Sequence, residues 1–211
     1  MTMIAELPAN TVRPFNIIPF RPKGTPFMVR KLGGLWTIEG RVVCNLYDEK
    51  GVLQIQTESW NTVTDVGDRF YSYRGANEQP PDDHFTTGAA LTFDGIMELY
   101  KSVSVAPTKG AVRSGLTGGV LITGSDQVID VGYPKSNDLD SGNTGKDPDA
   151  ITYRVTYATV DANDSAIDDV IITNPSPSAG DNMLMWADGL GSFTKTSSDT
   201  LVVYVNHQMT G

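Results

Sequence analysis

An acidic segment contains the residues whose types could bind a metal ion. It spans residues 136–149 and reads SNDLDSGNTGKDPD. Asp138, Asp140 and Asn143 place oxygen ligands close together, as calcium requires. The spacing departs from that of an EF-hand, because a loop starting at Asp138 has a glycine where a ligand belongs and lacks the closing glutamate. We therefore predict a solvated loop with no metal and no other cofactor, and these three residues remain the alternative calcium ligands.

The residues that could support catalysis are few and isolated. His84, His207 and the single cysteine, Cys44, are far apart in sequence and lack the spacing of a zinc site. The sequence has neither a Gly-x-Ser-x-Gly elbow nor a glycine-rich nucleotide-binding loop. Cys44 lies in a segment of alternating polarity, which favours a small buried side chain over a nucleophile. We predict a protein that is not an enzyme and has no catalytic residue.

Charge is unevenly distributed along the 211 residues, whose net charge is −9. Residues 1–31 contain five basic residues and one acidic residue, a net charge of +4, so residues 32–211 carry −13. The negative total disfavours a nucleic-acid-binding surface. A basic arm on an acidic body suits binding to an acidic partner, although the arm could also neutralise its own body.

Residues 1–31 predict an extended arm. Five prolines in this range remove backbone donors and favour extended geometry, so no helix can form. The aromatic and aliphatic residues between them are too frequent for a solvated tail and need a surface to cover, on this chain or on a neighbouring subunit. The residues expected to bind a partner are Arg13, Phe15, Ile17, Ile18, Phe20, Arg21, Lys23 and Phe27.

The elements that follow the arm begin at Trp36 with a period-two pattern typical of strands. Residues 36–47 and 52–60 flank a turn that contains Gly51, which predicts a hairpin. Residues 61–75 predict a short helix that is capped by Thr64 or Asp65 and ends at a glycine.

Further strands are expected along the rest of the chain, at residues 91–105, 120–123, 127–130, 151–158, 169–173 and 200–207. About eight strands separated by turns predict an all-β body, a β-sandwich or jelly roll over residues 32–211, behind the arm of residues 1–31. Because the sequence has no long apolar run and no signal-peptide pattern, we expect a chain that is made in the cytoplasm and does not enter a membrane.

Three groups of segments resemble small virion proteins of tailed bacteriophages that are described as structural, decoration or fibre-associated. They are GRVVCNLYDEKG at 40–51 with WNTVTDVGDRFY at 60–71, GYP at 132–134 with ITYRVTY at 151–157 and VIITN at 170–174, and DTLVVYVNH at 199–207. The resemblance implies a location in the virion, other virion proteins as partners and no catalytic residues. It does not extend to the arm.

This family implies a capsid decoration or cement protein, a jelly roll that clamps shell subunits and is expected to be a homo-oligomer. A phage tail, neck or fibre protein with a receptor- or glycan-binding role is the alternative. Aromatic loop tips such as residues 186–189 could bind sugar, although Trp186 is more often a packing residue. The 25 acidic residues could also supply the carboxylate pair of a β-sandwich carbohydrate hydrolase.

Overall fold

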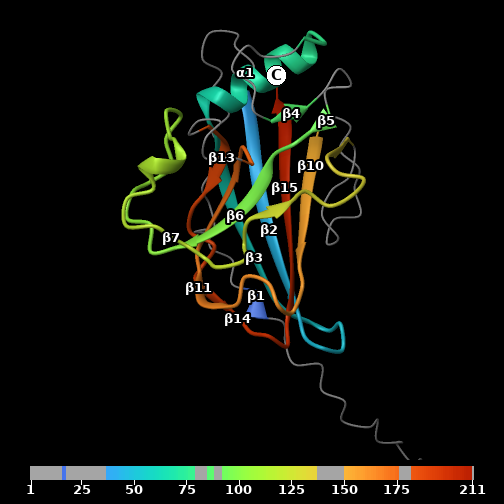
Figure 1. The fold of residues 1–211 in the computed structure, drawn as a ribbon, viewed down its shortest axis with the longest axis vertical. Coiled ribbons are helices and arrows are strands. Elements are labelled where there is room, and N and C mark those ends of the chain that lie inside the picture. Colours follow the sequence, from blue (N-terminus) through green and yellow to red (C-terminus); the bar gives the residue numbers. More distant parts are fainter. Residues whose placement is uncertain are drawn as a thin grey trace, which may run out of the picture.

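The body of the protein is an all-β sandwich with one short helix at one end (Figure 1). The computed structural model describes residues 16–17, 37–78, 85–87, 92–136, 150–175 and 182–210. Strands in antiparallel ladders make up most of the regular structure in these ranges. The expected fold class is therefore confirmed.

One long sheet forms most of the sandwich, with its strands in the order β7-β6-β12-β13-β3-β2-β15-β10-β9. Its strands are β7 (Val120–Leu121), β6 (Ile96–Lys101), β12 (Asp169–Thr173), β13 (Met183–Ala187), β3 (Leu53–Val63), β2 (Thr37–Tyr47), β15 (Thr200–Thr210), β10 (Ala150–Tyr157) and β9 (Lys135–Ser136). Off this path, β8 (Gln127–Val128) pairs with β6 and β1 (Asn16–Ile17) pairs in parallel with β3. Two small ladders join β4 (Thr86–Thr87) to β5 (Thr92–Phe93) and β11 (Asp164–Ile167) to β14 (Phe193–Lys195).

The sheet curls until strands from the two ends of the path meet. The hydroxyl of Tyr157 in β10 donates to the carbonyl of Met97 in β6 at 3.3 Å. The backbone N–H of Asp130, just after β8, donates to the carbonyl of Arg154 in β10 at 2.9 Å. Apolar side chains from both halves of the curled sheet fill the space between them and form the main core.

A second, smaller cluster covers the outer face of β6, β12 and β13. It contains Tyr100, Leu116, Ile171, Met183 and Trp186, with side chains from the segment after β6 packed against it. That segment includes a single 3-10 turn, η1 (Arg113–Gly115). This part of the sheet is therefore buried on both faces, and all five residues of β12 and of β13 are buried.

The predicted hairpin and helix are both confirmed. Strands β2 and β3 pair along almost their whole length, and Gly51 supplies the positive φ of the turn between them. Helix α1 (Asp65–Gly75) begins after Thr64, whose side-chain oxygen accepts from the backbone N–H of Gly67 at 3.1 Å. This contact satisfies a backbone donor in the first turn, which has no partner within the helix. The helix packs against β13.

Other strand predictions are only partly correct. The single strand expected at 91–105 is divided into β5 and β6 by Asp94 and Gly95, and it ends at Lys101. A Cβ on Gly95 would lie only 2.4 Å from the aromatic ring of Phe93, so the chain bends closely around this ring. Strand β13 was not predicted, because burial of both its faces removes the alternation expected of a strand.

Two glycines of α1 provide a test of how tightly the helix packs on the sheet. A Cβ on Gly67 would lie 2.3 Å from the carbonyl oxygen of Leu184 in β13, whereas nothing lies within 4 Å of a Cβ on Gly75. We expect Gly67→Ala to lower the free energy of unfolding by about 1–3 kcal/mol, the usual cost of overpacking. Gly75→Ala should be neutral or stabilise the protein by up to about 1 kcal/mol. Urea unfolding of both variants measures the difference, and equal effects would contradict the close helix–sheet contact.

Candidate functional site

A pocket opens between α1 and the strands at the same end of the sandwich, with a volume of about 440 Å³. Helix α1 contributes Phe70, Tyr71 and Arg74 to its wall, and β10 contributes Ile151 and Tyr153. Among the other described residues, Phe93 and residues 133–136 also line the pocket. Its volume lies within the range of small-molecule sites, roughly 300–1,000 Å³.

Aromatic rings form much of this wall. The ring of Phe93 lies 5.0 Å from that of Tyr153 and 5.9 Å from that of Phe70, both measured between centroids. Tyr133 lies under two cations, Lys135 Nζ at 4.6 Å and Arg154 Cζ at 4.5 Å from its centroid. These contacts hold several aromatic faces in fixed positions around the cavity.

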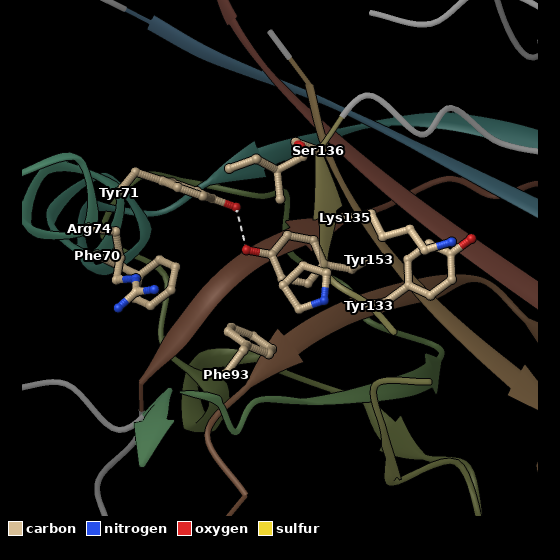
Figure 2. Close-up of a pocket in the computed structure, with 10 residues that line it drawn as sticks. Phe70, Tyr71, Arg74, Phe93, Tyr133, Lys135, Ser136 and Tyr153 are labelled. Carbon is tan, nitrogen blue, oxygen red and sulfur yellow. Dashed lines mark hydrogen bonds between the residues drawn. The ribbon is translucent and has the colours of Figure 1, made fainter. Parts of the chain in front are cut away.

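A chain of buried polar groups leads from the pocket into the sandwich. The hydroxyls of Tyr71 and Tyr153 lie 2.9 Å apart. Figure 2 marks this contact with a dashed line. The Tyr71 hydroxyl also contacts Nδ1 of His207 in β15, and Nε2 of His207 lies 2.9 Å from Nδ2 of Asn61 in β3. Side-chain hydrogen bonds thus join helix α1 to strands β10, β15 and β3.

The protonation state of His207 and the donor groups around it limit which atom donates in each of these hydrogen bonds. Burial lowers the pKa of His207 to about 3, so its ring is neutral near pH 7. In this orientation of the Asn61 amide its nitrogen faces Nε2 of His207 and can only donate, so Nε2 accepts and Nδ1 carries the proton. Nδ1 then donates to Tyr71, and either tyrosine can donate in the contact between the two hydroxyls. The two hydroxyls hold two protons and share one hydrogen bond, so one of these protons has no acceptor among the described residues.

Burial also raises the pKa of Tyr71 and of Tyr153, so both hydroxyls remain protonated at physiological pH. Neither tyrosine is a nucleophile in that state. Beside them, the half-buried guanidinium of Arg74 makes no side-chain hydrogen bond or ion pair within the described residues. Figure 2 shows Arg74 on the helix side of the hydroxyl pair and Lys135 on the opposite side. The described residues that line the pocket therefore present hydrogen-bond donors and positive charge, and none of them has a carboxylate.

The sequence analysis did not predict that these residues lie close together. Tyr71 and Tyr153 are 82 positions apart, and Tyr71 and His207 are 136 apart. Each lies in an element that was predicted, but the predictions gave no pairing between the helix and the distant strands. The one local signal was the aromatic pattern within residues 151–157 and at the end of α1.

Of the predicted partner-binding arm, the structure describes Asn16 and Ile17, which form β1. Asn16 pairs with Ile55 and Ile17 with Gln56, in a parallel ladder on β3. The other residues predicted for the arm lie outside the described residues: Arg13, Phe15, Ile18, Phe20, Arg21, Lys23 and Phe27.

The other candidate residues of the sequence analysis are the proposed calcium ligands, Cys44 and Trp186. Asp138, Asp140 and Asn143 lie outside the described residues. Cys44 is buried in the main core, where burial raises the pKa of its thiol to about 12, as expected of a packing residue. Trp186 is buried in β13, so the packing interpretation of this residue is confirmed.

Among the described residues, no group of three or more His, Cys, Asp or Glu side chains is placed to hold a metal ion. The helix of this part of the chain is too short and too polar to cross a membrane. Comparison with known protein families, curated proteins and solved structures found no match.

Proposed function

We propose that this chain is a non-enzymatic structural protein of a tailed-phage particle, a capsid decoration protein whose N-terminal arm binds shell subunits. The observation that carries the proposal is the pairing of β1 with β3. In this ladder the proline-rich arm adds a strand to the edge of a sheet, which is how extended segments commonly dock onto a partner protein.

The edge that receives β1 is left open by the sheet itself. Strand β13 pairs with β3 only from Asn61 to Val63, so β13 does not pair with the first part of β3. The arm pairs there through two residues, in parallel register. Parallel pairing is slightly weaker per residue than antiparallel pairing, so this two-residue ladder contributes little to holding the arm on its own body.

Charge supports the same role for the arm. The arm carries +4 and the rest of the chain −13, so an arm released from its own body would be drawn to an acidic surface. Its apolar side chains would provide most of the binding free energy, since burying a large apolar side chain contributes roughly 1.5–3 kcal/mol, against roughly 0–1 kcal/mol for an exposed ion pair. The basic residues would speed the encounter and set its orientation.

Two triple variants test this division of roles. Replacing Phe15, Ile17 and Phe20 with Ser should abolish binding to empty capsid shells at any salt concentration. Replacing Arg13, Arg21 and Lys23 with Ser should weaken binding at low salt and matter little at high salt, because salt screens exposed charges. Titration of labelled protein onto shells at both salt concentrations measures these effects.

Deletion of residues 1–31 is the control for folding. The truncated protein should unfold cooperatively, because the core strands begin at Thr37, and it should not bind shells. An apolar triple variant that binds shells as wild type does would contradict the proposed role of the arm. Failure of the truncated protein to fold would show that the arm belongs to its own core.

A second candidate function is a tail, neck or fibre protein with a receptor- or glycan-binding role. The pocket between α1, β9 and β10 favours this candidate, because it combines aromatic walls with hydrogen-bond donors. Sites of this composition suit small polar ligands with an apolar face. The two candidates use different parts of the chain, so they can be tested separately.

A further inference from the structure

We propose that the pocket between α1, β9 and β10 binds a sugar that bears a carboxylate, with Arg74 as the partner of the carboxylate group. The inference rests on the second candidate function and specifies its ligand class. Three properties of the pocket lead to it: its aromatic walls, the Arg74 guanidinium and a hydroxyl donor.

The aromatic walls suit a sugar ring. A pyranose has apolar C–H faces and a polar rim, and aromatic rings bind such faces while leaving the rim to hydrogen-bonding groups. The rings of Phe93 and Tyr153, with centroids 5.0 Å apart, lie on one side of the pocket, and Tyr133 lies on the other. The cavity of about 440 Å³ is large enough for a monosaccharide.

The charge of the pocket selects an acid. The chain as a whole carries −9, yet among the described residues the titratable side chains that line the pocket are Arg74, Lys135 and the tyrosines. A half-buried guanidinium without a hydrogen-bond or ion-pair partner in the described chain is poorly solvated and is available to a ligand. Its planar fork of N–H groups matches the two oxygens of a carboxylate.

The Tyr71–Tyr153 hydroxyl pair adds a neutral donor to the pocket. Because neutral His207 donates to Tyr71, the pair holds two protons but makes one hydrogen bond between its hydroxyls, and one proton is left for a ligand. An acceptor-rich ligand satisfies both this hydroxyl pair and Arg74, whereas a cationic or donor-rich ligand satisfies neither. A carboxylated sugar combines the acceptors with a ring for the aromatic walls.

Ligand titrations on the full chain, followed by two-dimensional NMR, test this assignment. Glucuronic acid and N-acetylneuraminic acid are the probes, glucose is the matched neutral ring, and glutamate is the matched carboxylate without a ring. We expect both acidic sugars to shift resonances of Tyr153 and of α1, and to bind at least about tenfold more tightly than glucose or glutamate, as the loss of one charged hydrogen bond or of ring stacking implies.

Two arginines of the same helix give matched variants. Arg74→Gln removes the cation of the pocket and should weaken acidic-sugar binding about 10- to 100-fold while leaving glucose unchanged. Arg69→Gln removes an exposed charge outside the pocket lining and should change neither. Thermal melting of both variants verifies that each is folded.

Three outcomes would overturn the proposal: no binding of either acidic sugar at millimolar concentrations, equal binding of glucuronic acid and glucose, or equal binding of glutamate and glucuronic acid. The last result would indicate a site for acidic peptides. Adsorption of the purified protein to host cells is a separate readout of the receptor role. Sugar binding without adsorption would retain the ligand class and reject the receptor function.

Discussion

Replacement of Arg113 by Met should lower the free energy of unfolding by about 3–5 kcal/mol at neutral pH, because breaking a buried ion pair leaves one charge uncompensated. The side chain of Glu98 in β6 is fully buried, and Arg113 Nη2 donates to its Oε1. The hydroxyl of Tyr100 donates to the other carboxylate oxygen at 3.0 Å. A single neutral donor cannot replace the guanidinium.

The same variant should become less destabilised as the pH falls. Burial already raises the pKa of Glu98 in the folded protein, and loss of Arg113 removes a group that lowers it. Uptake of a proton by Glu98 would therefore relieve the unpaired charge. For the same reason, Glu98→Gln introduced into the Arg113→Met variant should recover much of the lost stability.

Lys109→Met is the matched control for this prediction. The Lys109–Asp68 pair has a short separation of 2.6 Å, but both side chains are largely exposed, and such a pair contributes roughly 0–1 kcal/mol. Urea unfolding of the three variants at two pH values measures all of these effects. Equal losses for Arg113→Met and Lys109→Met would show that burial of Glu98 does not determine the strength of its ion pair.

Replacement of Asp169 by Asn should stabilise the protein by roughly 2–4 kcal/mol at pH 8, since one unit of pKa shift corresponds to about 1.4 kcal/mol. Asp169 lies in β12 and is completely buried. Burial, followed by the charges of Asp188 and Asp168, raises the pKa of its carboxyl to about 7, against 3.8 for an ordinary Asp. Its Oδ1 accepts from Trp186 Nε1 at 2.8 Å, a bond that the amide oxygen of Asn can also accept.

The pH dependence of this gain has a defined sign. Between pH 3.8 and about 7 the unfolded chain ionises at this position while the folded protein retains its proton, so the contribution of Asp169 to stability falls as the pH rises through this window. The advantage of Asp169→Asn should therefore be absent near pH 4, grow up to pH 7 and then stay constant. Asp169→Asn and the exposed control Glu49→Gln can be compared by urea unfolding across this range. A gain independent of pH would contradict the buried, protonated carboxyl.

The sequence by itself determined the elements whose structure depends on near neighbours. Alternating polarity and the turn at Gly51 were sufficient for the β2–β3 hairpin, and the Thr64 cap was sufficient for the start of α1. Strand β10 was also predicted to within one residue at each end, and β15 was predicted from its first residue to His207, because β-branched and aromatic residues dominate both of them. In these cases the signal is local, since period and turn chemistry act over a few residues.

Only the tertiary structure decided which strands are buried on both faces and which distant residues share the pocket. Strand β13 has no alternation because the core covers one face and the segment after β6 covers the other. The pocket joins Arg74 of α1 to Tyr153 of β10 and, through Tyr71, to His207 of β15. These contacts follow from how the sheet curls and how the helix packs on its end, and both depend on long-range packing that no local sequence pattern encodes.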